Sequence, residues 1–323
     1  MILRQPNWAQ NLLATQVASA EGEGGRGQGQ QQQQQQGVSP VMELVMALSD
    51  QRLYREVVWS LKRGLHDARS EFSFVRMRGL NALAKFMSSA ANAEKVMELF
   101  RGSQSYQELQ VVPVLFDYAL APRKRLAKNL GIVGAAEAGS DVESAPTTAE
   151  VTVALRVLEG CCLLYSGCRA TASQHAAVSE LIDFFLAGGP SVQSTCLDGL
   201  LAVMLDSPPN QKEFERVHGL RKIAEMLRNS HLDPDIRLKI AEFIVILISQ
   251  VLPNGNRGFG IGEGSKPAWM TKWAQQELVE ILGEESSALV DGIIDAGRQT
   301  FSDQDNQQTS MLRYAQELLH LAS

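Results

Sequence analysis

Apolar residues recur every three or four positions along most of the chain, the spacing that forms one face of an α-helix. The pattern begins at Pro40, with Val41, Leu44, Val45 and Leu48 on one face. Comparable segments follow at 53–65, 75–87, 93–100, 111–120, 151–165, 190–205 and 234–252. Short β-branched runs such as FIVILI lie within longer helical windows, so their length favours helix over strand. We therefore predict an all-α chain.

The segment SPPNQKEFERVHGL, residues 207–220, interrupts this pattern. Pro208 and Pro209 cannot continue the preceding helix, because proline lacks the N–H that a helix interior needs. Asn210 is the predicted N-cap of a short new helix, with Glu213 three residues later as in a capping box.

Two further helices are expected after this connector. Gly219 allows a sharp turn, and Leu220 starts the next helix. Asp233 is expected to cap a third, with Pro234 at the first helical position, where its missing N–H costs nothing. An armadillo-type unit has this order of elements: short helix, turn, helix, loop and long helix.

The same order recurs along the chain. VPVLFDYALA, from Val112, aligns without gaps on VSELIDFFLA, from Val178. In the next unit, the segment VHGLRKIAEML is equivalent to VSELIDFFLA, with Leu181 matched to Leu220 at an offset of 39 residues. The segment Leu80 to Phe100 is expected to form an earlier, degenerate unit.

The long helices repeat as well. At an offset of 42 residues, Leu155, Leu158 and Leu163 match Leu197, Leu200 and Leu205, and at 44 residues Cys196 matches Ile240. Periods near 40 are typical of armadillo and HEAT arrays, whose units stack because none buries its apolar face alone. We predict an armadillo/HEAT-like helical solenoid; an irregular helical bundle with chance similarity is the alternative.

Composition divides the chain further. Residues 21–37 are rich in Gly and Gln and cannot bury apolar surface, so a disordered linker is expected there. The predicted organisation is an amphipathic N-terminal segment at 1–20, the linker at 21–39, a helical repeat domain at 40–252 with a loop at 131–148, a Gly-rich loop at 253–267, and C-terminal helices at 268–323 that complete the array.

The net charge of -6 and the aromatic content of 6% disfavour nucleic-acid binding, which needs basic surfaces or stacking platforms. No apolar run reaches the roughly 20 residues of a membrane span. The chain is expected in the cytoplasm, with an organellar transit peptide at its N-terminus as an alternative.

No motif predicts a cofactor, a metal site or a small-molecule substrate. Cys161, Cys162, Cys168 and Cys196 lie in apolar helical patterns without zinc-type spacing, so buried thiols are expected. The Gly run at 255–264 is not a phosphate-binding loop, since no strand precedes it and no Lys-Ser/Thr follows. Its alternative use is as a docking loop around Phe259.

A basic cluster follows the helix that ends near residue 121. It comprises Arg123, Lys124, Arg125 and Lys128. Cations are favoured near a helix C-terminus, so a solvated basic end is one interpretation. The other is a dock for an acidic or phosphorylated segment of a partner.

The chain resembles a known family over roughly residues 155–294, and the similarity is sharpest over 193–247. Three motifs support the similarity. The first is the connector with Asp206, Pro208, Asn210, Phe214 and Glu215, and the second is the Gly219-Leu220 pair at the start of the next helix. The third is the run Arg237, Leu238, Lys239, Glu242 and Phe243. These are similar to cell division control protein 14 of the fungal septation initiation network, which is not the phosphatase of the same name. This chain departs from the fungal pattern in its glutamine tract, its Gly-rich insert, and residues 244–248 in place of an aromatic-rich helix end.

The resemblance implies an armadillo-like, non-catalytic subunit that binds a germinal-centre-type protein kinase and relays a cytokinesis signal. It implies a location in the cytoplasm, at the spindle pole or the division site. It transfers no individual contact residue.

Three functions are compatible with the sequence. The first is a scaffold whose long helices at 151–165, 190–205 and 234–252 line a concave surface; these contain no Asn and no Trp, which disfavours binding of extended basic peptides. The second is a helical adaptor unrelated to cytokinesis. The third is an all-helical enzyme, which needs a polar, convergent pocket that these segments do not predict.

Overall fold

The computed structural model describes residues 40–120, 146–251, 269–298 and 304–322, and every regular element in these ranges is helical. The predicted all-α class is therefore confirmed for this part of the chain. The expected N-terminal segment 1–20, the linker 21–39 and the Gly-rich loop 253–267 lie outside the described residues, as does most of the loop 131–148.

The chain divides into two compact units, residues 1–57 and residues 58–323, with the boundary inside helix α2 (Pro40–Ala68). The described part of the first unit is the beginning of α2. Helix is confirmed there, but Val41, Leu44, Val45 and Leu48 are 55–70% exposed. This apolar face therefore does not contribute to a core in the structure.

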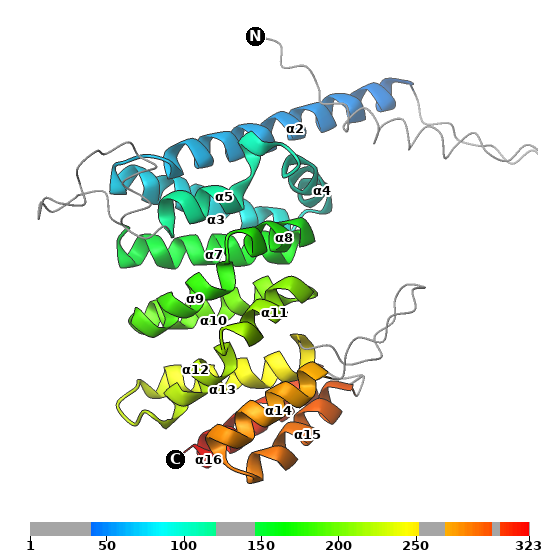
Figure 1. The fold of residues 1–323 in the computed structure, drawn as a ribbon. Coiled ribbons are helices and arrows are strands. Elements are labelled where there is room, and N and C mark those ends of the chain that lie inside the picture. The colour runs from blue at the N-terminus through cyan, green and yellow to red at the C-terminus, as the bar shows by residue number, and fades with distance from the viewer. Residues whose placement is uncertain (1–39, 121–145, 252–268, 299–303, 323) are drawn as a thin grey trace, which may run out of the picture. The chain divides into compact units, whose positions relative to one another are not determined.

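The second unit is a succession of packed helices (Figure 1). Their bounds are α3 Ser73–Ala91, α4 Glu94–Ser103, η1 Gln107–Leu109, α5 Val111–Val114, η2 Leu115–Ala119, α7 Thr148–Leu164, α8 Ser166–Gln174, α9 Ala177–Ala187, α10 Pro190–Met204, α11 Pro208–Arg216, α12 Gly219–Glu225, η3 Met226–Arg228, α13 Pro234–Ile246, η4 Leu247–Val251, α14 Trp269–Leu282, α15 Glu285–Arg298 and α16 Gln304–Leu321. The long helices contact one another in the order α3, α7, α10, α13 and α16.

Two consecutive groups of helices share one plan. Helices α11, α12 and α13 begin 42, 42 and 44 residues after α8, α9 and α10. The five buried positions of α9 reappear 42 residues later as Gly219, Leu220, Ile223, Ala224 and Leu227. Leu181 therefore corresponds to Ile223, and the predicted match to Leu220 at an offset of 39 is wrong. The reason is that α9 and α12 start in the same way. Each follows a residue in the left-handed conformation, Ala176 with φ of 51° and His218 with φ of 53°.

The predicted offset of 42 residues between α7 and α10 is confirmed at the buried positions. Leu155 and Leu158 are fully buried, and so are Leu197 and Leu200. The third predicted pair is different, because Leu163 is 56% exposed and Leu205 is only partly buried. Those two leucines therefore lie at the edge of the core.

The connector between α10 and α11 differs from its prediction. Pro208 is the first residue of α11 after Ser207, so the prolines start this helix, in keeping with the preformed φ that proline brings to a first turn. Asn210 is not the N-cap. It is buried, and its Nδ2 donates to the carbonyl oxygens of Arg169 (2.9 Å) and Val203 (3.0 Å), so it ties α11 to the preceding helices. Glu213 forms no capping box and pairs instead with Arg216.

The two later predictions for this region have different outcomes. Asp233 caps α13 as expected, accepting a 2.8 Å hydrogen bond from the Asp235 N–H, with Pro234 as the first helical residue. Gly219 serves packing rather than the turn, since His218 adopts the left-handed conformation. A Cβ at Gly219 would lie 2.4 Å from the ring of Phe214, so only glycine permits this close approach.

One charged pair lies inside the helical stack. Arg76 of α3 and Glu150 of α7 have no exposed side-chain surface, and Arg76 Nε donates to Glu150 Oε1 at 3.0 Å. The same guanidinium donates to the carbonyl oxygens of Ser70 (3.1 Å) and Glu71 (2.8 Å). Glu150 also completes a capping box with Thr147. The pair therefore joins the α2–α3 turn to the start of α7.

Candidate functional site

The residues singled out for partner binding, Arg123, Lys124, Arg125 and Phe259, all lie outside the described residues. Their roles stay predictions. Among the described residues, one feature that could contact a partner is the outward face of the long helices α7, α10 and α13, which pack side by side in that order (Figure 1).

The helical repeat places polar side chains of this face in register. Asp198 of α10 lies 42 residues after Arg156 of α7, and Glu242 of α13 lies 44 residues after Asp198. Each of the three is exposed or partly exposed. Lys239, almost one turn before Glu242, places its Nζ 2.7 Å from Asp198 Oδ1. A row of alternating charge therefore crosses the three helices.

Glu159 lies one turn beyond Arg156 on α7 and is partly buried. Burial raises its pKa, and the nearby negative charge of Asp198 raises it further, while Lys239 and Arg156 act in the opposite direction. No hydrogen bond or ion pair within the described residues engages the Glu159 carboxylate. A partly desolvated carboxylate without a partner is disfavoured in the free protein, and an external cation would relieve it.

The same face becomes apolar beyond Glu159. Leu163, one turn further along α7, is 56% exposed, and Leu201 and Leu205 of α10 are partly exposed. We term the residues Arg156, Glu159, Leu163, Asp198, Lys239 and Glu242 the α7–α13 patch. The patch places an exposed leucine beside charged side chains on one face of the three helices.

This patch is not among the binding residues predicted from the sequence. The available signal was the spacing of Arg156 and Glu159 between buried leucines of α7, which marks the outward face of the helix. What the spacing could not supply was the pairing of Lys239 with Asp198, since this depends on how α10 and α13 pack.

The cysteines are free and buried, as predicted. Burial raises the pKa of Cys196 to about 12 and the pKa of Cys161 and Cys162 well above the ordinary range, with neighbouring thiols adding to the effect at those two. His175 stacks on Phe116 with ring centroids 5.5 Å apart. The searched part of the chain holds no cluster of His, Cys, Asp or Glu arranged to bind a metal.

We expect all four thiols to resist alkylation in the folded chain, because only the exposed thiolate reacts. Iodoacetamide followed by mass spectrometry should modify none of them before unfolding and all four in guanidinium chloride. Modification of Cys161 in the folded chain at the unfolded rate would show that this part of the core is open.

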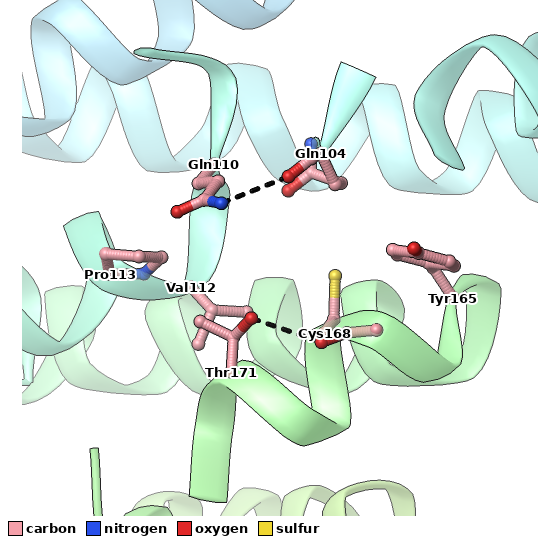
Figure 2. A pocket seen from close by; sticks show the side chains of 8 residues that line it. Gln104, Gln110, Val112, Pro113, Tyr165, Cys168 and Thr171 are labelled. Carbon is pink, nitrogen blue, oxygen red and sulfur yellow. Dashed lines mark hydrogen bonds between the residues drawn. The ribbon is translucent and has the colours of Figure 1, made fainter. Parts of the chain in front are cut away.

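Two adjacent cavities lie between α5, η1 and α8. The smaller measures about 120 Å³, and Figure 2 shows its lining. Gln110 Nε2 donates to the Gln104 carbonyl oxygen at 3.2 Å, and Thr171 Oγ1 donates to the Gly167 carbonyl oxygen at 3.1 Å. The larger measures about 700 Å³ and includes Arg69, Tyr118 and His175. Gln110 and Thr171 in the smaller cavity thus already bind backbone carbonyl oxygens, so they contribute to the local structure.

A further ionic cluster joins α12 to α14. Arg221 Nε donates to Glu277 Oε2 at 2.8 Å and also binds Glu280, while His218 Nδ1 lies 3.3 Å from Glu277 Oε1. Burial alone would raise the pKa of Glu277, but the hydrogen bonds from Arg221 and His218 outweigh it and lower the pKa. This carboxylate is therefore already paired within the chain.

In the described ranges, no helix is both long and apolar enough to cross a membrane. The described part of the chain is all-helical, and its long helices pack in sequence and carry a mixed charged and apolar outward face. The family model for cell division control protein 14, SIN component, matches residues 90–317, and the chain belongs to this family. The match confirms the resemblance inferred from the sequence and indicates a role in septation signalling.

A search of curated proteins found no significant match. Among solved structures, the crystal structure of an engineered protein from the Northeast Structural Genomics Consortium is similar, with 14% identity and a TM-score of 0.36. The similarity covers 80% of this chain and 98% of that one.

Proposed function

We propose that this protein is a non-catalytic scaffold that binds and supports a germinal-centre-type protein kinase in a cytokinesis or septation pathway. The observation that carries the proposal is membership of the SIN component family over residues 90–317, a range that includes the helices from α4 to the greater part of α16. The proposed site of action is the cytoplasm, at the spindle pole or the division site.

The arrangement of the described residues is compatible with a binding role. The core of the helical groups consists mainly of apolar side chains, and charged side chains such as Arg156, Asp198 and Glu242 lie on the outward face of the long helices. We interpret the groups as armadillo-type units, because each consists of two short helices and one long helix at a period of 42–44 residues. Repeats of this kind use extended surfaces for partners rather than enclosed pockets.

Two further contacts belong to the proposal. The basic cluster with Arg123, Lys124 and Arg125 would bind an acidic or phosphorylated segment of the partner. Phe259 would anchor a docking loop. Reversing the charge of Arg123 and Arg125, or deleting residues 259–262, should weaken binding, and unchanged affinity would remove the corresponding contact from the proposal.

The proposal is tested by purifying the tagged full chain from its own organism and identifying its stable partners by mass spectrometry. We expect a germinal-centre-type kinase in stoichiometric amount, and we expect the two recombinant proteins to elute together in gel filtration. Repeated absence of such a kinase, together with another stable partner, would favour a helical adaptor outside cytokinesis. An untagged strain is the control for non-specific capture.

A further inference from the structure

Three charged side chains of the α7–α13 patch have no ion-pair partner within the residues that the structure describes: Arg156 and Glu159 on α7, and Glu242 on α13. The charges between them are already used, since Asp198 and Lys239 bind each other at 2.7 Å. Glu159 and Glu242 therefore lie on the two helices that flank this pair, where their carboxylates can meet the cations of a partner.

We propose that the α7–α13 patch is the docking surface for a basic, amphipathic helix of the partner, an inference that rests on the proposed scaffold function. Arg or Lys side chains of that helix contact Glu159 and Glu242, and an apolar side chain covers Leu163. Arg156 faces an acidic residue of the same segment.

The spacing of the helices defines the partner segment. Packed helices lie about 8–10 Å apart, so α7 and α13, separated by α10, lie roughly 16–20 Å apart. A helix that crosses them rises about 1.5 Å per residue and covers this distance in roughly 11–13 residues, or about three turns. Two basic residues about 11 positions apart lie on the same face of such a helix and can reach both carboxylates.

Charge and exposure favour this occupant over others. A phosphorylated or acidic segment would face two carboxylates and only one guanidinium that have no ion-pair partner among the described residues. A purely apolar helix would bury those charges without partners, which is unfavourable. Leu163, 56% exposed and one turn from Glu159, supplies the apolar contact about 6 Å from the charge.

The test uses the full chain and the recombinant germinal-centre-type kinase, with affinity measured by calorimetry or biolayer interferometry. Glu159→Arg, Glu242→Arg and Leu163→Asp are each expected to weaken binding about tenfold or more, because like charges or a buried aspartate would then meet the partner. Matched controls are Glu225→Arg on α12 and Leu186→Asp on α9, which are also exposed and lie outside the patch. The controls should retain wild-type affinity.

Glu159→Gln separates docking from folding. Since burial and Asp198 raise the pKa of Glu159, the ionised carboxylate is disfavoured in the free protein, and the neutral amide should leave Tm unchanged or raise it. Binding should nevertheless weaken, because the amide cannot form an ion pair. A lowered Tm with unchanged affinity would mean that Glu159 is structural and would overturn the proposal.

The failure of the docking surface can be told apart from failure of the scaffold function. If the wild-type chain binds the kinase and the patch variants bind equally well, the patch is wrong and the scaffold function stands. If the wild-type chain does not bind the kinase, a photocrosslinker replaces Leu163 in cells, with the same group at position 186 as control. Crosslinking at 163 to a basic amphipathic helix of another protein, abolished by Glu159→Arg, supports the patch; crosslinking to no such segment overturns it.

Discussion

Arg76→Ala is expected to lower the free energy of unfolding by about 3–5 kcal/mol, the usual effect of removing one partner from a buried ion pair. Arg76 and Glu150 are both fully buried, so the substitution leaves the Glu150 carboxylate without its cation in a low-dielectric setting. The carbonyl oxygens of Ser70 and Glu71 lose their donor at the same time. Urea denaturation followed by circular dichroism measures the change.

The matched control is Arg78→Ala on the same helix. Arg78 binds Asp67 at 2.8 Å, but its side chain is 59% exposed, and exposed pairs contribute only about 0–1 kcal/mol. If Arg76→Ala costs no more than Arg78→Ala, the Arg76–Glu150 pair does not join α3 to α7 in solution. The double variant Arg76→Met/Glu150→Leu should recover much of the lost stability, because it removes both charges.

Leu200→Ala is expected to cost roughly 2–5 kcal/mol through the loss of apolar burial and the cavity that remains. Leu200 is fully buried in α10, which packs against α7, α9 and α13. Its equivalents by the repeat offsets, Leu158 and Ile244, are also fully buried. Thermal and urea unfolding of the full chain measure the loss.

Leu201→Ala is the control for this prediction. Leu201 neighbours Leu200 but is only partly buried, so its truncation should cost clearly less. Equal effects of the two substitutions, or no effect of Leu200→Ala, would mean that the register of the long helices is wrong.

Local rules predicted much of the fold. Helices follow from apolar spacing, and the start of α13 follows from Asp233 and Pro234, because both signals depend on residues close in sequence. The helices α14, α15 and α16 lie within residues 268–323, where C-terminal helices were predicted. These features need no knowledge of the neighbouring helices.

Features that depend on packing were predicted less well. Asn210 is a residue type that is preferred at an N-cap, but the carbonyl oxygens of Arg169 and Val203 lie within its reach only in the folded chain. Leu181 resembles Leu220 as an apolar residue, and only the start of each helix shows that Ile223 is its equivalent. Sequence similarity between short apolar segments cannot fix a shift of three residues.

The candidate site illustrates the same division. The long helices were predicted to provide the binding surface, whereas the charged residues chosen from the sequence, Arg123, Lys124 and Arg125, came from a conspicuous local cluster. The α7–α13 patch is dispersed over three helices at intervals of 42 and 44 residues, and its Asp198–Lys239 pair forms only after stacking. A single amino-acid sequence contains no signal for such a pairing.

Hydrogen–deuterium exchange of the full chain, with and without the recombinant germinal-centre-type kinase, tests the central claim most directly. Peptides from α7, α10 and α13 should exchange more slowly in the complex, while those from α9 and α12 should be unchanged. Protection confined to α9 and α12, with none on the long helices, would contradict the assignment of the outward face as the surface that binds the partner.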